Sequence, residues 1–147
     1  MKEQMRHPCN GAGSRYKSKA ETQLARLFER EHIQFRYEYP LAVVDRGKTR
    51  IWYPDFQLPE YGIIVEYFGV NGDSDYDKQS QHKEQVYQDS GIDVLCLSGD
   101  CLKGDWPTQI MGQIESILKN RLERFCRRQQ KGREGQKATS LHAGLQQ

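Results

Sequence analysis

A short, strongly apolar segment that ends in an acidic residue constrains this chain more than any other feature. Ile63, Ile64 and Val65 follow one another without a polar residue, and Glu66 stands where one more aliphatic residue would be expected. Consecutive aliphatic residues of this kind are typical of a strand that is buried on both faces. A carboxylate at the end of such a strand costs free energy unless it is paired or bound to a cation. The sequence therefore predicts a central strand that ends in a functional acid.

The residues around this strand predict an alternation of helices and strands. Ser18 and Glu21 have the spacing of a helix-capping box, and apolar residues recur behind them at helical spacing to about residue 31. The elements expected next, in order, are strands over 34–44, 49–56 and 63–65, a helix over 75–89, a strand over 92–97 and a helix over 107–127. This order predicts an α/β fold with an αβββαβ core, in which helices flank a mixed central sheet and a further helix follows at the C-terminus.

The length and composition of the chain fit one domain. With 147 residues, of which 36% are hydrophobic and 29% charged, the chain can form a single core of ordinary size. We expect a flexible N-terminal arm over 1–17, one folded domain over 18–128 and a disordered basic tail over 129–147. No apolar run approaches the roughly 20 residues of a membrane helix, and the polar N-terminus lacks the apolar part of a secretion signal. A cytoplasmic protein that does not bind membranes is expected.

Charge is distributed unevenly along the chain. The stretch from Lys119 onward has eight basic and two acidic residues, so it carries +6, while the whole chain carries +2 and the preceding body therefore −4. Such a distribution fits a tail that holds nucleic acid and a body whose carboxylates bind cations. A solvated helix end that runs into a disordered segment explains the same charges. The four cysteines lack the spacing of a zinc site, and we expect reduced thiols.

Three carboxylates stand where packing alone would not favour an acid. Asp55 follows Pro54 at the end of the second expected strand, Glu66 ends the apolar strand, and Glu21 flanks the apolar stripe of the first helix. Converging carboxylates repel one another unless a divalent cation neutralises them. Oxygen ligands of this kind suit Mg²⁺, with Mn²⁺ as a substitute. Glu21 as a helix cap and Asp55 as a turn residue are the structural explanations of the same positions.

The Pro-Asp pair at Asp55, a short spacer and Glu66 on an apolar strand resemble the PD-(D/E)XK nuclease superfamily. The restriction-endonuclease-like core of that superfamily has the same order of helix, three strands, helix and strand, and the resemblance covers about 18–97. It implies that Asp55, Glu66 and the backbone carbonyl of Tyr67 hold the metal ion. It also implies that Glu21, from the first helix, assists as an outer ligand.

The resemblance departs from the usual pattern at one position. The family generally places a lysine two residues after the strand acid, on the same face of the strand, and this chain has Phe68 there. Some branches of the family bring a lysine from the following helix instead, and Lys83 resembles that residue. It shares one helix face with Tyr76, Val86 and Tyr87. A lysine whose stem packs while its ammonium group reaches water is the structural alternative.

The residues and the resemblance together predict a hydrolase, a Mg²⁺-dependent endonuclease that cuts the DNA backbone with its 18–128 domain. Lys83 is expected to orient or help to deprotonate the attacking water, or to offset developing negative charge. Further basic residues are expected to bind DNA through its phosphates, without reading its sequence. These residues are Lys78, His82, Arg124, Arg127 and Arg128.

Two alternatives to an active nuclease remain open on the sequence. The first is a nuclease fold that has lost catalysis and serves to bind nucleic acid or assemble a complex, which the replacement of the usual lysine by Phe68 favours. The second is an unrelated α/β protein whose acids are incidental. The sequence is also compatible with a homodimer or with a subunit of a larger DNA-processing machine. It does not indicate a preferred DNA structure or distinguish DNA from RNA.

Overall fold

A four-stranded mixed sheet forms the centre of the fold. The computed structural model describes residues 15–69 and 74–143, and it describes the backbone alone at 74–77 and 134–143. The elements, in order, are α1 (Lys19–Arg30), β1 (Arg36–Tyr37), β2 (Leu41–Asp45), β3 (Lys48–Trp52), β4 (Phe56–Leu58), β5 (Ile63–Phe68), α2 (Ser74–Asp89), β6 (Asp93–Ser98), a 3₁₀ turn (Gly99–Leu102) and α3 (Trp106–Ala143). The expected α/β class, mixed sheet and C-terminal helix are confirmed.

The apolar segment around Val65 is the central strand that the sequence predicts. The strand order in the main sheet is β1-β4-β5-β6, so β5 has a neighbour on both sides. It pairs antiparallel with β4, where Phe56 lies opposite Val65, and parallel with β6, where Leu95 lies opposite Val65. The parallel pair requires a crossover connection, and α2 provides it.

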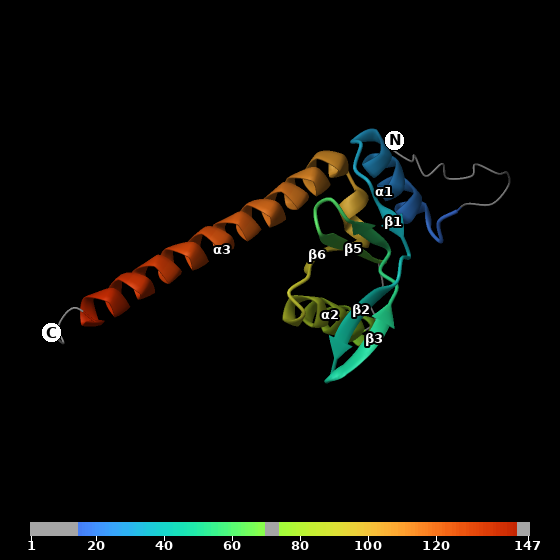
Figure 1. Cartoon of the computed structure of the whole chain (residues 1–147). Coiled ribbons are helices and arrows are strands. Elements are labelled where there is room, and N and C mark those ends of the chain that lie inside the picture. The colour runs from blue at the N-terminus through green and yellow to red at the C-terminus, as the bar shows by residue number, and fades with distance from the viewer. Residues whose placement is uncertain (1–14, 70–73, 144–147) are drawn as a thin grey trace, which may run out of the picture.

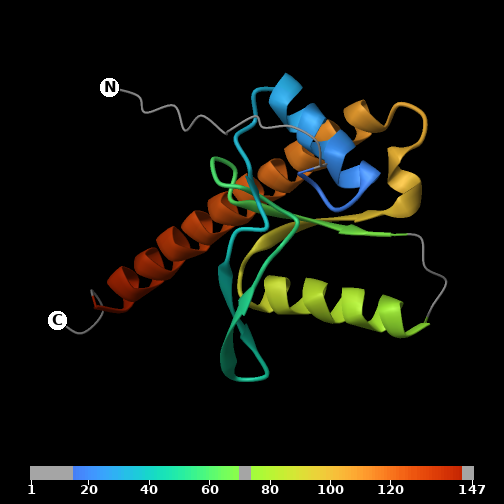
Figure 2. The ribbon, with the colours of Figure 1, turned by 90° about the vertical axis from the view of Figure 1, so that its right-hand side faces the viewer.

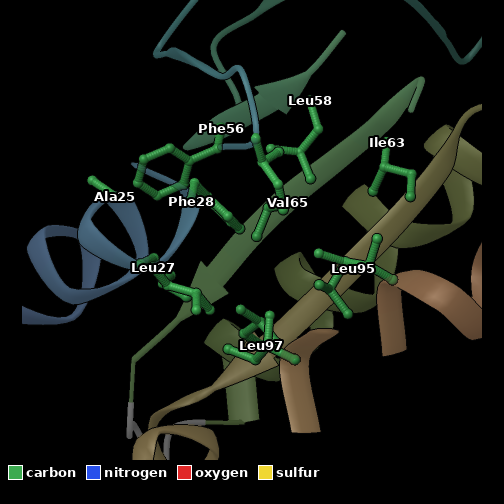
Figure 3. Close-up of a cluster of buried hydrophobic side chains, with 13 residues drawn as sticks. Ala25, Leu27, Phe28, Phe56, Leu58, Ile63, Val65, Leu95 and Leu97 are labelled. Carbon is green, nitrogen blue, oxygen red and sulfur yellow. The ribbon is translucent and has the colours of Figure 1, made fainter. Parts of the chain in front are cut away.

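Helices cover both faces of the main sheet. Figures 1 and 2 show α1 and the start of α3 on one face, and α2 on the other. The larger core cluster lies between the sheet and the α1–α3 side (Figure 3). Its members include Leu24, Phe28, Phe56, Leu58, Ile63, Val65, Leu97, Ile110 and Ile114. The smaller cluster, on the α2 side, consists of Val43, Ile64, Val86 and Tyr87.

The alternation of side chains along β5 decides where its acid points. Ile63 and Val65 belong to the cluster on the α1–α3 side, whereas Ile64 belongs to the cluster on the α2 side. Glu66 is two residues after Ile64, so it shares the α2 face of the sheet, because strand side chains repeat every two residues. The structure thus buries the predicted acid beneath α2.

The strand expected over 49–56 is split in two. The chain leaves β3 at Trp52 and enters β4 at Phe56, and these strands belong to different sheets. Pro54 lies at the break and is almost fully buried. Proline has no amide hydrogen for a ladder, so the segment cannot continue as one paired strand. The β2–β3 hairpin forms a two-stranded sheet of its own.

The expected strand over 34–44 is also divided. Its first part is the two-residue β1, which lies at the edge of the main sheet, and its second part is β2 of the hairpin. Glu38 lies between them with a φ of 45°. A left-handed backbone at a non-glycine residue is uncommon and bends the chain out of a strand. The hairpin therefore begins beside the main sheet without being part of it.

The C-terminal helix is longer than the sequence pattern predicts. It was expected to end near 127, but α3 continues to Ala143, into the stretch 129–147 for which a disordered tail was expected. The prediction followed the apolar stripe, which ends near Phe125, whereas the later residues are mostly Arg, Gln, Lys, Glu and Ala, which favour helix without packing. The described side chains from Leu122 onward are exposed, and the helix projects away from the body (Figures 1 and 2).

A flexible N-terminal arm was expected over 1–17, of which 1–14 lie outside the described residues. The last residues of this stretch contact the folded domain. The ring of Tyr16 packs edge-on against Tyr37 with their centroids 4.9 Å apart. The amide of Lys17 donates a hydrogen bond of 2.8 Å to the side chain of Glu21. Residues 16 and 17 are thus held by the folded domain. In the part of the chain that the structure describes, no helix has the length and apolar character needed to cross a membrane.

Candidate functional site

A cleft of about 280 Å³ opens between the end of β5 and α2. Its lining residues are Asp55, Glu66, Tyr67, Phe68, Gln79, Ser80 and Lys83. The cleft thus gathers the two strand acids and the helix lysine that the sequence singles out. They come from three separate segments, which the pairing of β4 with β5 and the packing of α2 on the sheet bring together.

Glu66 is the most deeply buried acid of this cleft, with a relative exposure of 2%. The ammonium group of Lys83 lies 3.0 Å from each of its carboxylate oxygens. The hydroxyl of Tyr87 donates a further hydrogen bond of 2.6 Å to Oε1. Lys83 and Tyr87 are four residues apart on α2, so both side chains project from the same helix face toward the strand. These bonds fix the orientation of the carboxylate.

Asp55 has an unusual electrostatic environment. The amide of Tyr67 donates a hydrogen bond of 2.7 Å to its Oδ2. Burial raises the pKa of Asp55 to about 6, and the negative charges of Glu66 and Glu21 add to the rise, while the Tyr67 amide and Lys83 oppose it. The Tyr67 amide and Lys83 thus only partly offset the negative charge of ionised Asp55 in the cleft. A cation close to Asp55 would be strongly attracted to it.

The side chain of Lys83 reaches the cleft from α2. Its side chain is 36% exposed, so its ammonium group lies at the boundary between Glu66 and the solvent in the cleft. Val86 and Tyr87, from the same helix face, are buried in the smaller core cluster. The side chain of Tyr76, the fourth residue assigned to this face, lies outside the described residues. Phe68, at the position of the usual lysine, is half-buried and lines the cleft.

Glu21 takes the capping role that the sequence allows and also lies near Asp55. Its amide donates to Ser18 Oγ at 3.1 Å, which confirms the N-terminal cap. Its Oε2 accepts hydrogen bonds from the amide of Lys17 at 2.8 Å and from the hydroxyl of Tyr37 at 2.6 Å. Where side chains are described, no three His, Cys, Asp or Glu residues come close enough together to form a metal site by themselves. The structure therefore brings Asp55 and Glu66 into one cleft and leaves Glu21 at its periphery.

The basic residues expected to bind nucleic acid fall into two separate regions. Lys78 is exposed on α2, and His82 lies nearby on α2, with its Nε2 atom 3.0 Å from Oδ1 of Asp45 on the hairpin. Arg124 lies on α3 and donates a hydrogen bond of 2.9 Å to Asp93 at the start of β6. The cleft lies at the other end of this strand pair, because β5 and β6 run parallel.

Two more of these residues lie on the part of α3 that projects from the body. Arg127 is exposed and pairs with Glu123 on the same helix at 3.3 Å, and Arg128 is exposed as well. Figure 2 shows this part of α3 extending away from the end of β5. The structure does not bring Arg124, Arg127 and Arg128 together with the cleft residues.

Sequence reasoning missed two tyrosines that hold the acids. Tyr87 was placed on the correct helix face, but its hydrogen bond to Glu66 was not expected; the position four residues after Lys83 is the signal that indicates it. Tyr37 donates to Glu21 from β1, a contact between elements that no local spacing reveals. Burial and the adjacent carboxylate raise the pKa of each hydroxyl far above its usual value, so both tyrosines remain hydrogen-bond donors.

The chain was compared with known families, with curated proteins and with solved structures. None of these three comparisons gives a match.

Proposed function

We propose that this protein is a metal-dependent endonuclease that hydrolyses the DNA backbone and has a restriction-endonuclease-like core. The proposal rests on one observation above all. A buried carboxylate of β5, Glu66, and a half-buried carboxylate directly before β4, Asp55, share a cleft with the ammonium group of Lys83. Acids and a lysine in this arrangement are the residues that phosphodiester hydrolysis requires: oxygen ligands for a cation and a positive group beside the reacting phosphate.

The residues of the cleft fit a magnesium ion. Mg²⁺ is usually held by one or two carboxylates and keeps several waters, so Asp55 and Glu66 with the backbone carbonyl of Tyr67 form a sufficient donor set. The raised pKa of Asp55, caused mainly by burial, indicates a carboxylate whose negative charge needs a further cation. Bound there, Mg²⁺ or Mn²⁺ would polarise the phosphate and lower the pKa of a coordinated water.

The protein's own groups have distinct tasks in this proposal. The Tyr67 amide orients Asp55, and the Tyr87 hydroxyl orients Glu66, so neither carboxylate has to be ordered when substrate arrives. The ammonium group of Lys83 positions the attacking water, and its positive charge offsets the charge that grows on the phosphate oxygens. Glu21 lies at the periphery of the cleft, and its negative charge contributes to the raised pKa of Asp55.

Plasmid nicking tests this proposal directly. Purified protein is incubated with supercoiled plasmid in Mg²⁺, Mn²⁺ or EDTA, beside Asp55→Ala, Glu66→Ala and Lys83→Ala. Asp100→Asn is the matched control, because Asp100 is an exposed acid that pairs only with Lys103 among the described residues. We expect nicking that requires metal, persists in the control and is lost in all three cleft variants. Nicking by the wild type in EDTA, or by the Asp55 and Glu66 variants, would refute the proposed site.

A second candidate function is a nuclease fold without catalysis that binds nucleic acid or assembles a complex. The observation in its favour is that Lys83 contacts both oxygens of Glu66 and so compensates that buried charge without a metal ion. Thermal melting discriminates the two candidates when it accompanies the nicking assay. Stabilisation by Mg²⁺ that disappears in Asp55→Ala, with DNA binding but no nicking, indicates the inactive module. Melting curves that do not respond to metal, without DNA binding, indicate an unrelated α/β protein.

A further inference from the structure

The β2–β3 hairpin is a separate ribbon with a basic tip. Arg46 and Gly47 form the turn, and both have positive φ values, 50° and 73°, as a tight two-residue hairpin turn requires. Arg46 and Lys48 are exposed at this turn. The hairpin lies beside α2 and its tip extends past that helix (Figures 1 and 2).

The hairpin is fixed to the body along its inner face. Val43 is buried in the same cluster as Ile64 and Tyr87, and the ring of Trp52 packs edge-on against Tyr87 with their centroids 5.4 Å apart. Asp45, at the end of β2, lies 3.0 Å from His82 Nε2 on α2. The ribbon is therefore held in one position relative to α2 and to the cleft.

The charge exposed at the tip is entirely positive. Asp45 is the only acid between 41 and 53, and it is buried. Its carboxylate contacts His82 and also pairs with Arg50, whose Nε atom lies 3.5 Å from Oδ2. Asp45 directly precedes Arg46 and lies opposite Lys48 in the strand pair, but its carboxylate is buried and pairs with His82 and Arg50, whereas Arg46 and Lys48 are exposed. The tip thus presents two positive charges to the solvent.

The outer face of the ribbon is apolar, in contrast to its tip. Val44, Ile51 and Tyr53 have relative exposures of 57%, 54% and 61%. Alternation along the strands places Val44 and Ile51 on the face opposite to Val43. Ala42 and Thr49 complete this outer face without adding a charge. A partner of the ribbon must therefore match positive charge at the tip and uncharged surface along the strands.

The ribbon is connected at two points to segments that line the cleft. At its base, Tyr53 is two residues before Asp55 in the chain. Near its tip, Asp45 contacts His82, which directly precedes Lys83. The ribbon thus lies on the α2 side of the main sheet, the side to which Glu66 also points.

We propose that the β2–β3 hairpin is an arm that binds the DNA backbone beside the cleft, with Arg46 and Lys48 contacting phosphates. This inference rests on the proposed function and assigns part of its substrate-binding surface. DNA matches both properties of the ribbon, because it has regularly spaced phosphates and uncharged sugar and base edges in its grooves. A two-stranded ribbon also has the width that the major groove, about 12 Å wide, accommodates.

Binding measurements in EDTA test the arm separately from catalysis. The probe is a fluorescein-labelled 30-base-pair duplex of arbitrary sequence, and its fluorescence anisotropy is followed over a range of salt concentrations. The variant is Arg46→Gln with Lys48→Gln, which keeps a side chain with a Cβ at the strained position 46. The matched control is Arg26→Gln with Arg30→Gln, because both residues are exposed on α1, across the sheet from the hairpin.

We expect the hairpin variant to bind roughly tenfold more weakly at 100 mM salt, and the slope of log K against log salt to become shallower by about 1.8, because two phosphate contacts are lost. The control is expected to bind like the wild type. Equal binding by the hairpin variant and the wild type would overturn the arm, and so would an equal loss in the control, since net charge alone would then explain it. Failure of the wild type to bind the duplex would overturn it too.

The two proposals fail in different ways. Loss of binding in the hairpin variant, with no metal-dependent nicking by the wild type, would support the arm and contradict the nuclease. Nicking that needs Asp55 and Glu66, with full binding and nicking by the hairpin variant, would support the nuclease and contradict the arm. Circular dichroism melting of both double variants confirms that each is folded before binding is compared.

Discussion

The two ends of the β5–β6 strand pair both combine acids with basic residues from a helix, and they differ in how well the charges match. At the start of β6, Asp93 receives hydrogen bonds from Arg121 at 2.7 Å and from Arg124 at 2.9 Å. At the end of β5, Glu66 and Asp55 share the single ammonium group of Lys83 among the residues that line the cleft. One acid thus faces two cations at the first end, and two acids face one cation at the second.

This difference in charge matching is visible in the pKa values. Burial alone would raise the pKa of Asp93, but its bonds to Arg121 and Arg124 outweigh burial and lower it. Burial raises the pKa of Asp55 to about 6, and its bond to Tyr67 and the charge of Lys83 do not reverse the rise. Matched charge holds α3 to the sheet, whereas unmatched charge is suited to binding a cation. The same residue types therefore serve attachment at one end and, in our proposal, chemistry at the other.

The largest expected effect is the loss of nicking when a cleft acid is neutralised. Asp55→Asn or Glu66→Gln removes a ligand of the metal ion, and we expect nicking rates to fall on the order of 10³-fold, equivalent to several kcal/mol in the barrier. Asp93→Asn, at the other end of the strands, should retain nicking at a temperature where it stays folded. The measurement is the initial rate of plasmid nicking in Mg²⁺. A similar loss in all three variants would mean that the two ends do not differ as proposed.

Neutralising the lysine should have the next largest effect. Lys83→Met keeps the packing of the stem but removes the charge, so we expect nicking to fall by about 10²-fold or more. Lys119→Met, at an exposed position on α3, is the matched control. If nicking survives Lys83→Met but not the acid substitutions, the acids remain the site and the lysine has only a structural role.

A substitution at the matched end should change stability and leave chemistry intact. The guanidinium of Arg121 donates to Asp93 and also to the backbone carbonyls of Tyr61 at 2.6 Å and Gly62 at 3.1 Å. Arg121→Ala is expected to lower the free energy of unfolding by about 2 kcal/mol, because bonds to a charged partner are lost at a partly exposed site. Arg127→Ala, whose partner is exposed, should cost less than about 0.5 kcal/mol. Urea unfolding measures both, and equal values would contradict the assigned anchor.

The smallest expected effect is a dependence of stability on pH that originates at Asp55. Its folded pKa lies above the unfolded value, so the folded protein binds more protons between about pH 4 and pH 6, and stability falls as pH rises through this range. Asp55→Asn should therefore stabilise the metal-free protein by about 1–2 kcal/mol at pH 8, after allowance for solvent access, and by much less at pH 4. Thermal melting in EDTA at both pH values tests this. A gain that is the same at both pH values would have a cause other than charge.

Local sequence patterns predict the elements that pack with a regular period. The N-cap at Ser18, the buried strand that contains Glu66 and the helix face that includes Lys83 are all present in the structure. In each case the pattern is generated by residues that lie close in sequence and pack against one surface.

Features that depend on contacts between distant segments were not predictable in this way. Pro54 indicates an interruption, but the departure of the hairpin from the main sheet depends on the packing of Val43 against α2. The bond between Tyr37 and Glu21 joins residues sixteen positions apart, which no periodicity links. The length of α3 was underestimated because the described side chains from Leu122 onward are exposed, so this part of the helix has no apolar stripe to mark its end.

The projecting part of α3 has a consequence for how this protein can be connected to other molecules. From Leu122 to Ala143 the helix extends for about 33 Å at the usual rise per residue. A stiff rod of this length fixes both the distance and the direction of anything attached to its far end, unlike a flexible linker, whose reach varies from moment to moment. Because the rod leads away from the cleft, a fused tag, dye or surface anchor placed on it would leave the cleft accessible. The helix thus provides a natural spacer for immobilising the domain with its cleft facing the solution.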